Sequence, residues 1–168
     1  SSHQGFRVYG NSHGVLQSYP SSRHSLSCAV IAESGGDMQR DYAYTMSRRM
    51  ELLDAPESVG QEATLETISR LDTKQLETGK MPVMFRADIA SGLFGHFVAA
   101  ISGGNLYRDS SFLLDSLDSQ VFPDWLTIHE DPLIQQGLAS SYFDHEGVVT
   151  QKRNIVEQGV LKTWLLSS

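Results

Sequence analysis

The sequence is poor in cysteine and in basic residues, and each shortage excludes a class of protein. Its 168 residues contain one cysteine, Cys28, so the chain can form no internal disulfide framework. A reducing compartment, the cytoplasm, is the simplest expectation for such a chain. The 20 Asp and Glu outnumber the 13 Lys and Arg, for a formal net charge of -7. Because nucleic-acid binders present clustered positive charge, we expect no nucleic-acid partner.

Long apolar runs and nucleotide-binding motifs are also missing. No apolar run reaches the roughly 18 residues that a membrane helix needs, so we expect no membrane partner. The sequence has no G-x-G-x-x-G turn, Walker A loop or paired-cysteine motif. Its 40% hydrophobic and 20% charged residues are typical of a folded globular protein. Because the chain starts without Met and stops inside an apolar strand pattern, we expect an internal fragment of a longer protein.

Residues 1–79 are predicted to form an antiparallel sheet followed by one helix. Runs that favour β structure occur at residues 5–9, 15–19, 26–33 and 40–46, and polar turns separate them at 11–14, 20–22 and 34–37. A cap at Asp54, Pro56 in the first turn and the capping-box acid Glu57 predict a helix from about residue 56 to 71.

Residues 80–168 are predicted to begin a second domain. The boundary lies in the polar stretch that ends at Gly79-Lys80. The predicted elements are a buried strand at 82–85, a helix at 89–102, a strand at 125–129, and a final hairpin that pairs 148–156 with 160–166. The fold class is therefore expected to be α+β: an antiparallel meander with a helix, followed by the start of a second α+β domain.

The helix predicted at 89–102 has one apolar face and one face of small residues. The apolar stripe consists of Ile89, Leu93, Phe97, Ala100 and Ile101, widened by Phe94 and Val98. Ser91, Gly92, Gly95, Ala99 and Ser102 form the opposite face. Since glycine in a helix interior costs about 1 kcal/mol relative to alanine, we expect a backbone to approach that face closely.

This helix carries only one side chain that could coordinate a metal. A zinc hydrolase helix needs two imidazoles within one or two turns and a carboxylate that activates the bound water. Here only His96 is present, and no acid occurs from Ile89 to Gly104. We interpret His96 as a partly buried histidine at the edge of the apolar stripe. The residues alone therefore predict no catalytic residue and no metal ligand.

Three short matches to catalytic motifs have structural interpretations. Residues 10–14 satisfy G-x-S-x-G, but their Asn and Gly content favours a tight hairpin turn. His129-Glu130 begins like a zinc H-E-x-x-H motif, but Leu133 stands at the second histidine position and Pro132 breaks a helix. Residues 144–147, DHEG, could bind a metal or act as acid and base, although four polar residues before a strand favour a turn.

Longer stretches resemble the PmbA/TldD family of bacterial metallopeptidase-related proteins, and the PmbA (TldE) branch more closely than the TldD branch. The matching segments are residues 8–14 (VYGNSHG), 23–25 (RHS), 36–38 (GDM), 40–44 (RDYAY), 92–96 (GLFGH), 112–117 (FLLDSL), 123–128 (PDWLTI), 137–140 (GLAS), Asp144, 146–147 (EG), Gly159 and 164–166 (WLL). The similarity covers essentially the whole chain. It implies the family's central region and the start of its C-terminal domain.

The resemblance also implies where the chemistry lies. In the TldD branch the helix matching residues 89–102 carries an H-E-x-x-x-H zinc motif, whereas here Phe94, Gly95 and Ala99 occupy those positions. No zinc ligand is carried over, and we expect no cofactor in this chain. The expected partners are a TldD-like subunit that holds the zinc and a peptide substrate, in a cytoplasmic complex that degrades unstructured peptides.

We therefore expect a non-catalytic region of a PmbA-like subunit that contributes structure or substrate binding. The face of Gly92, Gly95, His96 and Ala99 is the expected close-packing or substrate-side surface. One alternative is a protein-interaction module, since the family is also described as modulating DNA gyrase. The other is a stand-alone hydrolase that uses His96, His129 or the Asp144-His145-Glu146 cluster.

Overall fold

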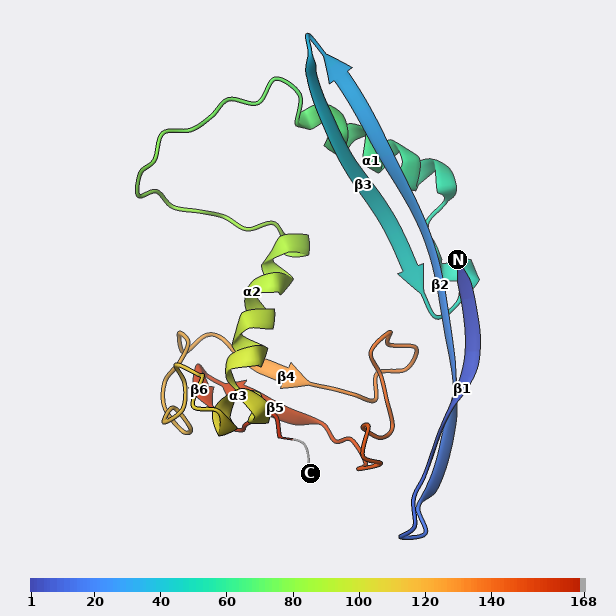
Figure 1. Ribbon diagram of the computed structural model, residues 1–168, viewed down its shortest axis with the longest axis vertical. Helices are drawn as coiled ribbons and strands as arrows, with labels where there is room; N and C mark the ends of the chain where they lie inside the picture. Colours follow the sequence, from blue (N-terminus) through green and yellow to red (C-terminus); the bar gives the residue numbers. More distant parts are fainter. Residues whose placement is uncertain (167–168) are drawn as a thin grey trace. The chain divides into compact units, whose positions relative to one another are not determined.

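The computed structural model describes residues 1–166 and divides into two compact units (Figure 1). Unit 1 comprises Ser1–Gly79 together with Gln135–Ser140. Unit 2 comprises Lys80–Ile134 and, among the described residues, 141–166. Each unit combines helices with a three-stranded antiparallel sheet. The predicted α+β fold class is thus confirmed.

Unit 1 is built on one long central strand. The strands are β1 (Ser2–Gly10), β2 (Leu16–Ser34) and β3 (Asp37–Ser47), in the order β1-β2-β3. The first half of β2 pairs with β1, and the second half pairs with β3 from the register His24↔Ser47 to Ser34↔Asp37. Burial alternates along all three strands, as a sheet covered on one face requires.

The turn predicted at residues 20–22 is wrong, because these residues continue β2. Pro20 pairs with Phe6 of β1. Over residues 16–23, β1 is the one described strand that pairs with β2, because β3 pairs with β2 only from residue 24 onward. The other edge of β2 therefore forms no backbone hydrogen bonds with a described strand over these residues. A proline is tolerated at such an edge. The two flanking turns are confirmed: Gly35 and Gly36 have φ values of 55° and 88°, which suit a tight hairpin.

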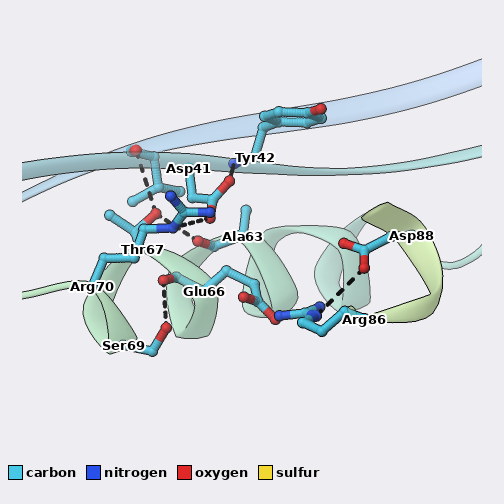
Figure 2. A network of polar contacts seen from close by, with 10 residues as sticks. Asp41, Tyr42, Ala63, Glu66, Thr67, Ser69, Arg70, Arg86 and Asp88 are labelled. Carbon is cyan, nitrogen blue, oxygen red and sulfur yellow. Dashed lines mark hydrogen bonds and ion pairs between the residues drawn. The ribbon is translucent and has the colours of Figure 1, made fainter. Parts of the chain in front are cut away.

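Helix α1 (Pro56–Ser69) covers one face of this sheet. Its buried residues Val59, Ala63 and Thr67 recur every four positions and therefore lie on one side of the helix. The Thr67 hydroxyl donates to the carbonyl of Ala63 at 2.7 Å. At the end of the helix, Arg70 forms an ion pair with Asp41 of β3 at 2.6 Å, as Figure 2 shows. Sheet and helix are thus joined by apolar packing and by the ion pair between Arg70 and Asp41.

The start of α1 differs from the expectation in one detail. Pro56 occupies the first helical turn as predicted, but the N-cap residue is Ala55, without a side-chain cap. Asp54 lies one position too early, and its N–H donates to the Thr45 hydroxyl at 3.2 Å. A short 3-10 helix, η1 (Met50–Leu52), precedes this point. The connection is therefore fixed by a bond to β3, and the predicted Asp54 cap is wrong.

The segment Gln135–Ser140 belongs to unit 1 because Arg48 holds it. The Arg48 guanidinium donates from Nε to the carbonyl of Gly137 at 3.2 Å and from Nη2 to the carbonyl of Leu138 at 2.9 Å. Nη1 donates to the carbonyl of Ser22 in β2 at 3.0 Å. One planar side chain therefore joins the sheet to a segment about 90 residues away in sequence.

Up to residue 166, unit 2 contains two helices and a small sheet. Its elements are α2 (Ala87–Ala100), α3 (Gly103–Tyr107), β4 (Ile128–Glu130), β5 (Arg153–Glu157) and β6 (Val160–Leu161), with sheet order β4-β5-β6. The core consists of Phe97, Ala100, Ile101, Leu113, Ile155, Val156 and Leu161. The final hairpin is confirmed, in a shorter form than predicted. No helix within residues 1–166 has the length and apolar character that a membrane crossing requires.

At the start of unit 2, one expectation is wrong and another is only half correct. The strand predicted at 82–85 has no regular structure, and Met84 is 96% exposed. An apolar run forms a strand only when a neighbouring strand pairs with it, and none of the described strands does so here. The apolar stripe of α2 is half correct: Phe97 is buried, whereas Ile89 and Leu93 are 61% and 50% exposed.

Candidate functional site

Helix α2 carries the positions that the sequence singled out. Gly92, Gly95, His96 and Ala99 are spaced by three and four residues, so the helix places them on one face. All four are exposed in the structure. The expectation of a partly buried His96 is therefore wrong. The remaining position that matches the zinc motif, Phe94, is 43% exposed.

The small-residue face of α2 is open in the described chain. A Cβ atom built on Gly92 or Gly95 would have no described atom within 4 Å. The close backbone approach inferred from the two glycines is thus not made by residues 1–166, and it stays a prediction about a partner or a substrate. A peptide or a helix that approached this face would find room for its backbone.

No three His, Cys, Asp or Glu side chains within residues 1–166 gather into a cluster that could hold a metal ion. His129 lies on β4, and its Nδ1 is 2.9 Å from the Asn154 side-chain oxygen. The neighbouring Glu130 pairs with Arg153 of β5 at 2.5 Å. Because adjacent strand residues point to opposite sides of a sheet, His129 and Glu130 cannot act together as they would on a zinc helix.

Residues 144–147 form a turn, as their composition predicted. The Asp144 carboxylate accepts hydrogen bonds at Oδ1 from the N–H of Glu146 at 2.8 Å and of Val148 at 2.9 Å. The turn closes at Gly147, whose φ of 81° suits glycine. The Val148 N–H is the main cause that lowers the pKa of Asp144 below its ordinary 3.8. The carboxylate charge is thus maintained by the turn that it stabilises.

This bonding predicts how acid affects the turn. A carboxyl group whose pKa is lowered by folding stabilises the native state above its ordinary pKa, and this stabilisation is lost as the pH falls through the lowered value. We expect the protection of the Glu146 and Val148 amides, measured relative to the intrinsic exchange rate at each pH, to fall in acid in the natural chain. Asp144→Asn should keep the turn and lose most of this acid dependence, because an Asn oxygen accepts the same bonds without titrating. Amide exchange or NMR shifts between pH 2 and 6 measure both effects, and an acid response that survives Asp144→Asn would contradict the assignment.

The turn at 144–147 also borders a pocket of unit 2 with a volume of about 870 Å³. Four segments of the chain meet there: residues 102–104, Glu130, the stretch from the turn to Arg153, and Leu165 with Leu166. The sequence alone does not reveal this pocket, because its lining comes from segments spread over residues 102–166. The features of the sequence that could have pointed to the pocket are the two acids within residues 144–146 and the Gly103-Gly104 pair.

Comparison with known proteins gives the same family for both parts of the chain. Residues 1–71 match the model of the PmbA/TldA metallopeptidase central domain, and residues 78–168 match that of the PmbA/TldA metallopeptidase C-terminal domain. The chain is 56% identical over 168 residues to Metalloprotease PmbA of Escherichia coli O157:H7. It is 53% identical over 168 residues to a Metalloprotease PmbA homolog of Haemophilus influenzae. In both cases the match covers 100% of this chain and 37% of the relative.

A solved structure extends the comparison to the fold. A protein from Bacteroides thetaiotaomicron, described as a candidate modulator of DNA gyrase, superposes with a TM-score of 0.93 at 28% identity. The match covers 99% of this chain and 38% of that protein. Strands, helices and their order are thus shared with a natural structure over nearly the whole chain.

Proposed function

The chain belongs to the PmbA/TldA metallopeptidase family, and from this premise we propose that it is the structural and substrate-binding part of a PmbA-like subunit. The proposed subunit acts in a complex that degrades or processes unstructured peptides. A TldD-like partner subunit supplies the zinc and the general base. The chain spans 37% of the length of its PmbA relatives, so the proposal concerns the complete subunit that contains these residues.

The observation that carries the proposal is that helix α2 lacks metal-binding side chains at the positions of the family's zinc motif. At the positions that match the family's zinc motif, Phe94, Gly95 and Ala99 have no side-chain atom that can bind a metal. A catalytic zinc in proteins has about three protein ligands and one open position. His96 alone falls short of that number. We therefore assign the metal to the partner, and we assign to α2 an exposed face that a peptide or the partner can approach.

The sheet of unit 1 supports a role in holding peptide. The sheet face opposite α1 presents Ile31, Tyr42 and Tyr44, whose side chains are 64%, 62% and 60% exposed. Tyr42 and Tyr44 stack with their ring centroids 6.3 Å apart. An extended peptide can also pair with a free sheet edge through its backbone, which gives affinity without strict sequence preference. This property suits a subunit that handles unstructured substrates.

The test uses the complete protein that contains this chain, with and without its zinc-bearing partner. We expect the zinc to copurify with the partner, and we expect hydrolysis of an unstructured peptide to need both subunits. His96→Ala should leave the zinc content of the complex unchanged. Hydrolysis at an equal rate without this subunit would sink the proposal, and so would one equivalent of zinc bound by this subunit alone.

Modulation of DNA gyrase is a second candidate, favoured by the description of the Bacteroides thetaiotaomicron protein. The net charge of -7 argues that such modulation would act through protein contacts. The two proposals differ in an observable. Direct DNA binding would weaken steeply with salt, whereas a protein contact should be detected with gyrase alone and in the absence of DNA.

A further inference from the structure

The pocket of unit 2 combines an acidic rim with an apolar wall. Among its lining residues, Glu130, Asp144 and Glu146 are acidic, Arg153 is the one Lys or Arg, and His145 lies between the two acids of the turn. Arg153 is already engaged by Glu130, with Nε and Oε2 2.5 Å apart. The lining therefore carries an excess of negative charge after this pair is formed.

Asp144 keeps its charge and retains an acceptor atom for a ligand. The bonds from the Glu146 and Val148 N–H groups both go to Oδ1, and a carboxylate offers about four acceptor sites, so acceptor capacity remains for a ligand. Hydrogen bonds from the turn lower the pKa of this carboxyl, so it is ionised at neutral pH. Removal of Asp144 from the rim would therefore change the charge of the pocket.

The apolar wall lies beside these acids. Val148 and Val149 follow the turn directly and are 49% and 59% exposed, and Leu166 is 65% exposed. An acidic rim beside exposed apolar groups complements a side chain that has an apolar stem and a positive head. Lysine and arginine have this form, and the volume of about 870 Å³ is enough for several residues of a peptide.

We propose that this pocket binds a basic residue of a peptide, with its stem against Val148 and Val149 and its cationic head at the acidic rim. The assignment of the cation to a peptide rests on the proposed function, whereas the preference for a cation rests on the lining alone. The pocket would give the subunit a preference for peptides that carry Lys or Arg.

The experiment compares peptides of one sequence that differ at a single position. The complete protein, without its partner, is titrated with fluorescent peptides that carry Lys, norleucine or Glu at that position. We expect the order Lys, norleucine, Glu in decreasing affinity, with a Lys preference that weakens as salt is raised. Because hydrolysis is not measured, this result is independent of whether the complex cleaves peptides.

Variants of the rim test the site itself. Asp144→Asn and Glu146→Gln should each reduce the Lys preference about two- to fivefold, the range of exposed charge pairs, and the norleucine peptide should be unaffected. Glu157→Gln, on β5 but outside the pocket lining, is the matched control and should change neither. Equal affinity for Lys and norleucine peptides would overturn the proposal, as would a Lys preference that both rim variants leave intact.

Two further outcomes bear on the occupant. Val149→Cys should react with a soluble maleimide in the complete protein, and a saturating Lys peptide should protect it. A thiol that is unreactive in the native protein but reactive after unfolding would mean that the protein fills its own pocket, against the proposal. Lysine amide that binds as tightly as the Lys peptide would overturn the assignment to a peptide.

Discussion

Replacement of Gly159 by alanine should destabilise unit 2 by about 2–5 kcal/mol. Two costs add. Gly159 has a φ of 78°, and a side chain in this left-handed region costs about 1–2 kcal/mol. A Cβ atom would also collide with the Gln120 side chain and with the carbonyls of Phe122 and Pro123. Two of these three atoms are backbone, so relief of the collision requires a shift of the chain.

The backbone bonds of Gly159 explain why such a shift would spread. Its N–H donates to the carbonyl of Leu126 at 2.8 Å, and its carbonyl accepts the N–H of Val121 at 2.9 Å and of Phe122 at 3.1 Å. The turn thereby holds the 121–126 segment against the β5-β6 hairpin. Movement of Gly159 would weaken all three bonds together and would disturb Phe122, which packs edge-on against Phe97 of the core.

Gly14→Ala is the matched control for the collision. Gly14 has a similar φ of 86°, but a Cβ there would have no described atom within 4 Å. This variant should therefore show only the conformational cost of about 1–2 kcal/mol, confined to unit 1. Hydrogen exchange resolves the two units, which a single melting temperature would not. Equal losses in the two variants would show that the collision is relieved without cost.

Local signals in the sequence predicted much of the fold. Helix α1, predicted over residues 56–71 and observed at Pro56–Ser69, and the turns at 11–14 and 34–37 depend on Pro56, Asn11 and the glycine pair, whose preferences act over a few residues. The strand assignment failed at Pro20 and at residues 82–85. In both places the outcome depends on whether another strand is present beside the segment, which a local pattern cannot report.

The candidate site was predictable only where one helix forms it. The face of Gly92, Gly95, His96 and Ala99 follows from helical spacing, and the structure keeps these residues together on α2. The burial of His96 could not be derived, because it depends on what covers the helix. The pocket of unit 2 was missed for a related reason: Glu130 and Arg153 meet through β4-β5 pairing, and a pairing register is a tertiary property.

Replacement of Arg48 by alanine should release the Gln135–Ser140 segment from the sheet of unit 1. The guanidinium donates to the carbonyls of Gly137, Leu138 and Ser22, and hydrogen bonds to a charged group contribute about 1.5–3 kcal/mol. The loss should appear as faster amide exchange at Ser140 and faster proteolysis within Gln135–Ser140. The ion pair between Arg70 and Asp41 should be unaffected, since it shares no partner with Arg48.

Two neighbouring substitutions separate geometry from charge. Arg48→Lys keeps the positive charge but cannot span three carbonyls with one planar fork, so it should restore only part of the protection. Arg49→Ala removes the same charge one position along, where the side chain is 55% exposed and pairs with Glu51 at 3.3 Å. Such an exposed pair contributes about 0–1 kcal/mol, so Arg49→Ala should leave the segment protected. If the Gln135–Ser140 segment is fully protected in Arg48→Lys, the positive charge alone holds it. If Arg49→Ala releases the segment as much as Arg48→Ala does, the hydrogen bonds of Arg48 are not what holds it.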